Sequence, residues 1–323
     1  DSHAFSLLSL NPAATLDLSN LGVRVIEPLA FDGLRCTGLL LSGSNLTTGI
    51  PSRAFRGLVL LGSLDLSHAG IALIESSAFQ GLQAGGSVLL SRNLMTSVSV
   101  HAFSGVAIAR DLAVEECAFL TAIETGAFSN AFIGGSLLLR RNPRLTSLNR
   151  MFWDGSQCNT TLLGTLDARQ NENLRIIPSR AFSCLHVGTV EAVLFQGSPV
   201  QIVQAFAFDG LSLLDTNSSN AVLDLSGLGI RVIGTMAFAG LRVRVANLTH
   251  NALTSLVPRT FGNLTVSEDL LLSGNDNLSS LLAGAFQGLT LGHSATLALA
   301  SMSISFIANG VFSGLNCAAV DLR

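Results

Sequence analysis

Phenylalanine recurs along the chain at a nearly constant interval, and this regularity constrains the fold more than any other feature. Thirteen of the 18 Phe residues follow one another at intervals of 23 to 30 residues. They are Phe5, Phe31, Phe55, Phe79, Phe103, Phe128, Phe152, Phe182, Phe208, Phe238, Phe261, Phe286 and Phe312. About fifteen residues before most of them lies a short segment of alternating Leu, as at residues 64–66, which is typical of a strand with one buried face. So short a strand cannot bury itself, so the spacing predicts a solenoid of about twelve stacked copies.

The repeat resembles a known family. Its pattern, LxLxxNxLxxIxxxAFxGL, is similar to the extracellular-type leucine-rich repeat, and residues 88–103 and 246–261 match it well. The resemblance covers essentially the whole chain. It implies an α/β-type solenoid: a curved array with a concave parallel β-sheet, short irregular convex segments and a spine of Phe side chains.

The repeats predict a single solenoid over residues 1–323 without capping domains. Its parts are a partial repeat at 1–15, complete repeats at about 16–319 and a truncated repeat at 320–323. The first residues do not have the pattern of a signal peptide. Uncapped repeats favour a segment of a larger protein and end-to-end self-association through the exposed ends.

In the family, an asparagine three residues after the second strand leucine bonds the backbone of the turn. This ladder residue is present at five positions, which are Asn93, Asn142, Asn171, Asn251 and Asn275. It is replaced at five others, which are Leu21, Ala69, Cys117, Leu228 and Met302. Because unpaired buried amides are costly, we expect water or altered turns at the replaced positions.

Composition argues against several functions. Charged residues make up only 12% of the chain, Lys and Tyr are absent, and the net charge is −3. Without Lys there is no phosphate-binding or Schiff-base lysine, and without a basic stripe we expect no nucleic-acid partner. No apolar run is long enough to span a membrane, so we expect no membrane contact by this segment. No hydrolase, zinc or phosphate-loop motif occurs, so we expect no catalytic residues, no metal and no cofactor.

Charge clusters on the expected concave face, and this is the clearest functional signal. Repeats three to seven supply the predicted ligand-contact residues, which are Asp65, His68, Arg92, Glu115, Glu116, Arg140, Arg141, Asp167, Arg169 and Gln170. Two alternatives stay open. The charges on neighbouring strands can simply neutralise one another. An apolar row on alternate strands offers a competing surface, formed by Leu40, Leu89, Leu138, Leu194 and Leu271.

Sequons and cysteines supply the remaining candidates. Two of six glycosylation sequons fall in the longer repeats, at Asn159 and Asn217, and the others start at Asn45, Asn247, Asn263 and Asn277. A glycan on Asn247 would obstruct the concave face there and favour the central repeats as the binding site. Cys158 and Cys184 lie one repeat apart, and a disulfide between them is weighed evenly against two unlinked thiols.

These features favour a non-catalytic recognition segment of a secreted or cell-surface protein, whose partner is a protein or a glycan. The alternatives are an intracellular leucine-rich repeat scaffold, and the ectodomain of a receptor kinase with its catalytic domain outside this segment.

Overall fold

The computed structural model describes residues 5, 11, 13–153, 155, 159–189, 193–213 and 221–323. The chain divides into two compact units, Asp1–Glu172 and Asn173–Arg323, which are described separately. The described residues contain no helix, so the α/β-type assignment is corrected to a β-solenoid of stacked coils. In this described part there is accordingly no helix that could cross a membrane. The single continuous array over residues 1–323 stays a prediction.

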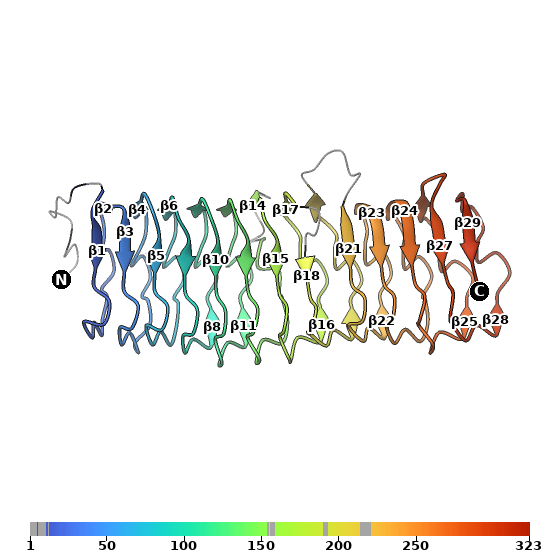
Figure 1. Cartoon of the computed structure of the whole chain (residues 1–323), viewed down its shortest axis with the longest axis horizontal. Coiled ribbons are helices and arrows are strands. Elements are labelled where there is room, and N and C mark those ends of the chain that lie inside the picture. Colours follow the sequence, from blue (N-terminus) through green and yellow to red (C-terminus); the bar gives the residue numbers. More distant parts are fainter. Residues whose placement is uncertain are drawn as a thin grey trace. The chain divides into compact units, whose positions relative to one another are not determined.

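A parallel sheet forms the front of unit 1 (Figure 1). Its strands, in hydrogen-bonded order, are β1 (Thr15–Asp17), β3 (Gly38–Leu40), β5 (Leu64–Asp65), β7 (Val88–Leu89), β10 (Leu112–Ala113), β13 (Leu137–Leu138) and β15 (Leu166–Asp167). Each coil places its first strand leucine opposite that of the next coil, as Leu39 is opposite Leu64. The coil interval of the sequence therefore sets the register directly.

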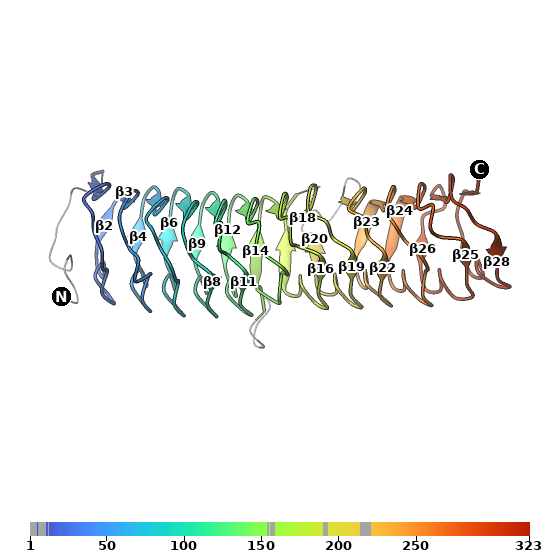
Figure 2. The same ribbon diagram turned by 90° about the horizontal axis from the view of Figure 1, so that it is seen from below.

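A second parallel sheet forms the return side of unit 1 (Figure 2). Its strands are β2 (Arg35–Cys36), β4 (Val59–Leu60), β6 (Gln83–Ala84), β9 (Ala107–Ile108), β12 (Phe132–Ile133) and β14 (Thr160–Leu162). A third, smaller sheet pairs β8 (Ser97–Val98) with β11 (Ala122–Ile123). The expectation of irregular return segments was therefore wrong, because these short strands pair from coil to coil.

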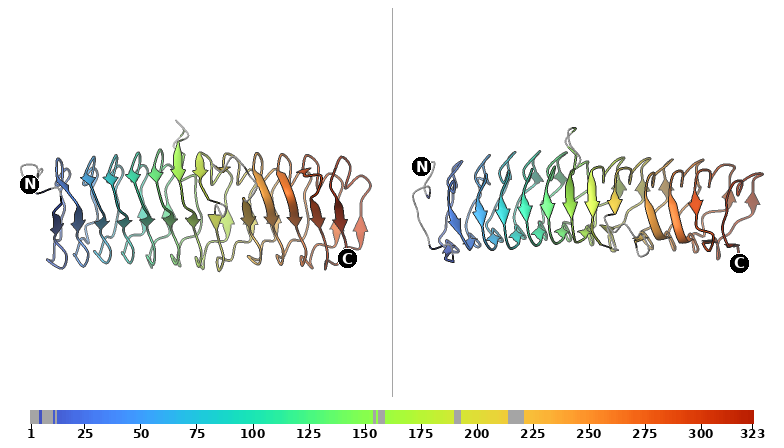
Figure 3. Two further views of the ribbon diagram at one scale, coloured as in Figure 1. Left: turned by 45° about the horizontal axis from the view of Figure 1, so that its top comes forward. Right: turned by 90° about the horizontal axis from the view of Figure 1, so that it is seen from above.

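Unit 2 repeats the same elements with longer strands near its middle (Figure 3). Its front sheet contains β21 (Val222–Asp224), β23 (Arg242–Asn247), β24 (Thr265–Leu271), β27 (Thr296–Ala298) and β29 (Ala319–Asp321). The other strands are β16 (Ile176–Ile177), β17 (Leu185–Val187), β18 (Val193–Leu194), β19 (Ile202–Val203), β20 (Ser212–Leu213), β22 (Val232–Ile233), β25 (Ser280–Leu281), β26 (Thr290–Leu291) and β28 (Phe306–Ile307). The pairing of β23 with β24 shifts register between Val243 and Val245. Each of these long strands therefore runs from the return side of its coil to the front side.

The regular Phe residues form the predicted spine in each unit. In unit 1, Phe79 is fully buried between Phe55 and Phe103, with ring centroids 5.0 and 4.7 Å apart. In unit 2, Phe261 stacks on Phe238 and Phe286 at 5.9 and 5.7 Å. Burying such a side chain stabilises the fold by roughly 1.5–3 kcal/mol, and ring stacking adds to this. The spine therefore holds each coil on the next.

Candidate functional site

Three rows of outward side chains run across the front sheet of unit 1, and we call this surface the front face. Each coil contributes the outward strand residue, the residue two positions further on and the residue after that. In one coil these are Asp65, Ser67 and His68. The third-row residue has a left-handed backbone in every coil of the unit, with φ of 53° at His68 and 60° at Arg92. This turn reverses the chain after the strand and aims the third-row side chain outward.

The third row carries a continuous polar chain across five coils. Arg92 donates from Nε to Glu116 Oε2 at 2.7 Å, and its Nη1 lies 3.2 Å from Nε2 of His68. On the other side of Glu116, Arg141 donates from Nη1 to Oε1 at 3.3 Å and from Nε to Oε1 of Gln170 at 2.8 Å. Glu116 therefore joins two guanidinium groups that lie on either side of its own coil.

Two further ion pairs lie beside this chain, and their arginines are in the second row. Arg140 binds the carboxylate of Glu115 on the preceding coil. Arg169 binds Asp167 within its own coil through two hydrogen bonds, of 2.9 and 2.7 Å. The Asp167 side chain is only 3% exposed, and it also accepts from the Arg169 amide at 3.1 Å. A bidentate pair of this kind fixes the plane of the guanidinium group.

All ten predicted contact residues lie on the front face of unit 1, and the structure joins nine of them in ion pairs or hydrogen bonds between side chains. The tenth, Asp65, accepts a hydrogen bond from the Ser67 amide at 2.9 Å. The ion pairs between charged side chains, which the sequence analysis gave as an alternative to ligand contact, are present. The sequence reasoning missed the link between Arg92 and Glu116, although their separation of 24 residues equals one coil. Ligand contact by these residues stays a prediction.

The ladder asparagines form hydrogen bonds with the backbone of two coils rather than one. The Asn93 side chain donates to the carbonyls of Leu66 and Leu90 and accepts from the amide of Ile71. It therefore serves its own coil and the preceding coil, whose ladder residue is Ala69. The expectation of water or altered turns at Ala69 was wrong, because the next coil supplies the missing partner.

Asn251 does the same for the coil of Leu228. Its Oδ1 accepts from the amides of Gly229 and Ile230, both at 3.0 Å, and its amide nitrogen donates to the Leu225 carbonyl. At three of the five replaced positions, Ala69, Cys117 and Leu228, the asparagine of the next coil therefore bonds the turn.

Glu116 on the front face and Cys117 beneath it have shifted pKa values. The hydrogen bond from Arg92 lowers the pKa of Glu116, and Arg141 adds to the effect. Burial raises the pKa of the Cys117 thiol to about 11. Cys117 occupies a ladder position, and its sulfur lies 3.7 Å from the Leu90 carbonyl oxygen. Glu116 is therefore a carboxylate at neutral pH, whereas Cys117 is a protonated and chemically quiet thiol.

The sequon residues differ in their exposure to solvent. Four of the sequon residues are exposed, namely Asn45, Asn159, Asn263 and Asn277. Asn247 ends β23 and is half-buried, and its Oδ1 accepts from the amide and hydroxyl of Thr249. Cys184 is disulfide-bonded. Cys158 and Asn217 lie outside the described residues, so their pairing and modification stay predictions.

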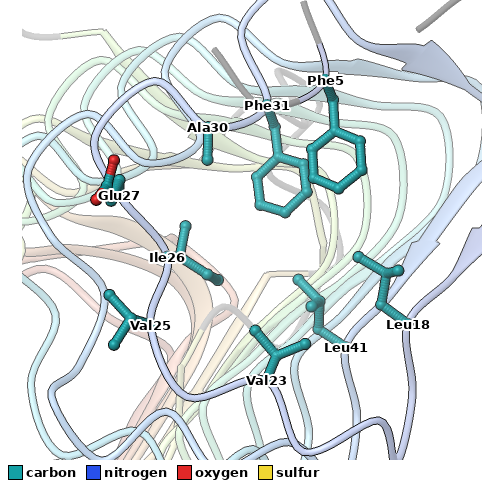
Figure 4. Close-up of a pocket in the computed structure, with 9 residues that line it drawn as sticks. All are labelled: Phe5, Leu18, Val23, Val25, Ile26, Glu27, Ala30, Phe31 and Leu41. Atoms are coloured by element: carbon teal, nitrogen blue, oxygen red, sulfur yellow. The ribbon is translucent and has the colours of Figure 1, made fainter. Parts of the chain in front are cut away.

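An apolar pocket of about 310 Å³ lies at the first coil of unit 1 (Figure 4). Its lining residues are Phe5, Leu18, Val23, Val25, Ile26, Glu27, Ala30, Phe31 and Leu41. Ile26, Ala30 and Phe31 are buried, Val25 and Glu27 are exposed, and the rings of Phe5 and Phe31 stack 5.1 Å apart. Only Glu27 brings a charged group to it, so the pocket lacks the converging polar groups of a typical ligand site. Among the described residues, no group of three or more His, Cys, Asp and Glu side chains could hold a metal ion.

Comparisons with known proteins agree with the repeat. Residues 2–133 match the family model described as a BspA type leucine rich repeat region, in six copies. A comparison with curated proteins found no match. Among solved structures, the chain is similar to one titled "Crystal structure of TLR13-ssRNA13 complex", with 16% sequence identity and a TM-score of 0.31.

That alignment covers 93% of this chain and 61% of the other, so this chain spans less than two thirds of the solved one. At so low a score the likeness carries no argument about ligand or function. The family match is therefore shown for residues 2–133, and coils of the same kind continue through the rest of the described residues.

Proposed function

We propose that this segment is a non-catalytic recognition module that binds a protein or a glycan on the front face of unit 1. The observation that carries the proposal is the polar chain from His68 to Gln170, which crosses five coils on an otherwise weakly charged molecule. Regular strands hold each of these side chains at a fixed spacing of about 4.8 Å per coil. Such a surface is ordered before the ligand arrives, which reduces the entropic cost of binding.

The front face of unit 2 offers much less charge. Most residues of its second and third rows are small or uncharged, such as Ser226, Gly227, Thr249, Ser273 and Gly274. Arg323 is an exception, and it binds Asp321 within its own coil. This contrast supports unit 1 as the contact region. A glycan on Asn247 would further restrict access to the front face of unit 2.

We place the module outside the cell or on its surface, as part of a larger protein. The exposed sequon residues and the disulfide-bonded Cys184 support this location, because disulfides persist in oxidising compartments. An intracellular scaffold is the second candidate, and the three free cysteines Cys36, Cys117 and Cys317 favour it. A receptor kinase ectodomain would use the same front face, with its catalytic domain outside this segment.

Binding to a panel of secreted proteins and immobilised glycans tests the proposal. The double variant Arg140→Glu/Arg141→Glu reverses two charges on the front face. The control, Arg53→Glu/Arg56→Glu, makes the same charge change at exposed residues beside the Phe spine. We expect the first variant to weaken binding of the strongest panel ligand at least tenfold and the control to change it less than twofold. Equal affinities for both variants would contradict a binding site on the front face.

A further inference from the structure

The arginines of the front face and the carboxylates that they bind differ in their exposure to solvent. Arg92, Arg140, Arg141 and Arg169 bind three carboxylates, those of Glu115, Glu116 and Asp167. The arginine side chains are 37–55% exposed, whereas the carboxylates that they bind are 3–32% exposed. The anionic groups therefore lie beneath the guanidinium groups. A ligand that approaches these coils therefore meets the guanidinium groups first.

The carboxylates also hold the guanidinium groups in place. Glu116 fixes Arg92 through its Nε, and Glu115 fixes Arg140 in the same way. A guanidinium group has five N–H donors in a planar fork. The Arg140 side chain forms its only hydrogen bond to a described residue through Nε, so the Nη donors remain for a ligand. Oriented forks of this kind match carboxylate and sulfate oxygens in pairs.

We propose that the front face of unit 1 binds an acidic glycan through these arginines, with carboxylate or sulfate groups of the polymer bridging the Nη donors of successive coils. This inference rests on the proposed function and names the ligand class of the same site. Arg140 and Arg169 stand on neighbouring coils about 4.8 Å apart, and Arg92 and Arg141 are two coils apart, about twice that distance. A chain of regularly spaced anionic groups can engage them together.

The composition of the face favours a glycan over the other polyanions. Among the described residues of the three rows in unit 1, none is Phe, Tyr or Trp. Tight protein interfaces depend on buried aromatic anchors, and single-stranded nucleic acids are held by bases stacked on aromatic side chains. The second row instead offers hydroxyl groups at Ser42, Ser67 and Ser91, which can exchange hydrogen bonds with sugar hydroxyls.

The test measures binding of the full chain to four immobilised probes. These are heparin as a sulfated glycan, polygalacturonate as a carboxylated glycan, dextran as a neutral glycan and polyuridylate as a nucleic acid. We expect binding to heparin, to polygalacturonate or to both, and none to dextran. The acidic glycan that binds more tightly shows whether the site prefers sulfate or carboxylate groups. Absence of binding to both, or tighter binding to polyuridylate than to either, would overturn the proposal.

Three variants distinguish a site with positioned guanidinium groups from nonspecific electrostatic attraction. Arg92→Gln/Arg141→Gln should weaken acidic-glycan binding at least tenfold, and Arg53→Gln/Arg56→Gln, with the same charge change, less than twofold. Glu116→Ala raises the net charge but releases both guanidinium groups. Simple attraction predicts tighter binding by this variant, whereas a positioned site predicts binding at least threefold weaker. Equal losses in both arginine variants, or tighter binding by Glu116→Ala, would overturn the proposal.

The failure of this inference is distinguishable from failure of the proposed function. If no acidic glycan binds, but a panel protein binds and loses affinity with Arg140→Glu/Arg141→Glu, the front face remains the binding site and only the ligand class is wrong. If that variant and its Arg53→Glu/Arg56→Glu control bind every ligand equally, the proposed function fails as well.

Discussion

The side chain of Asn142 completes the turn of the preceding coil by accepting a hydrogen bond from the Cys117 amide at 2.9 Å. Its amide nitrogen donates to the carbonyls of Val114 and Leu139, both at 2.8 Å. One buried amide thus pairs three backbone groups on two coils. The ladder therefore stabilises the stacking of coils as well as each turn.

Replacing Asn142 should destabilise the protein strongly. Asn142→Ala removes the partner of the Cys117 amide and of the Val114 carbonyl in a fully buried site, at a cost of about 2–3 kcal/mol, whereas the Leu139 carbonyl still accepts from Asn171 at 3.2 Å. Urea unfolding followed by circular dichroism measures the loss. The matched control is Asn149→Ala, an exposed residue whose loss should cost less than about 0.5 kcal/mol. Equal midpoints for the two variants would contradict the shared ladder.

The Phe spine predicts a second contrast in stability. Phe79 is fully buried between two stacked rings, so Phe79→Ala should cost about 3–5 kcal/mol. Phe132 lies on the return sheet and is 43% exposed, so Phe132→Ala should cost about 1 kcal/mol or less. Thermal unfolding of both variants tests this. A larger loss of stability for Phe132→Ala than for Phe79→Ala would show that the Phe spine does not stabilise the core.

The lowered pKa of Glu116 predicts a dependence of stability on pH. Because the folded-state pKa lies below the ordinary value of 4.5, ionised Glu116 stabilises the fold above that pH. The contribution is lost as the pH falls through the folded-state pKa. It is at most about 1 kcal/mol, since the Arg92 side chain is 55% exposed and solvent screens the pair.

Comparison of wild type with Glu116→Gln by urea unfolding at pH 7 and pH 3 measures this effect. The difference should be present at pH 7 and shrink at pH 3. Glu124 is exposed and forms no ion pair with any described residue, so Glu124→Gln should show a smaller difference at pH 7. A difference for Glu116→Gln that grows in acid would contradict the assignment.

The cysteines should differ in their reactivity. Burial raises the pKa of Cys36 and Cys117, whereas Cys317 is partly exposed, so native protein at pH 7.5 should react with N-ethylmaleimide at Cys317 alone. In urea without reductant, three thiols should react if Cys158 and Cys184 are joined. Mass spectrometry counts the labels. Five labels in urea would exclude the predicted disulfide.

Much of the fold was readable from the sequence because the repeat fixes the register. The repeat positions of Phe79, Leu64 and Asn93 are one coil apart from their equivalents, and each of these three residues is buried as the pattern predicts. The return sheet was not readable, because a strand as short as Gln83–Ala84 carries no alternation. Its pairing comes from coil stacking alone.

The charged cluster was also readable, since the position of each residue within its repeat places it on the front face. The ion pairs and hydrogen bonds within the cluster could not be predicted from the sequence. Whether Glu116 binds Arg92, Arg141 or both depends on side-chain directions set by the left-handed turn, and the composition of that turn gives no signal, because Arg, Glu and Gln all occupy it. The difference in exposure between the arginines and their carboxylates likewise appears only in the folded chain.

Arginine footprinting of the wild-type chain tests the central claim most directly. Because the chain contains no Lys, phenylglyoxal will modify mainly guanidinium groups, and mass spectrometry reads each of the 18 arginines separately. With the strongest ligand from the panel bound, we predict protection of Arg92, Arg140 and Arg141, while Arg53 and Arg56 stay modified. Protection of Arg53 and Arg56 with continued modification of the front-face arginines would contradict the account.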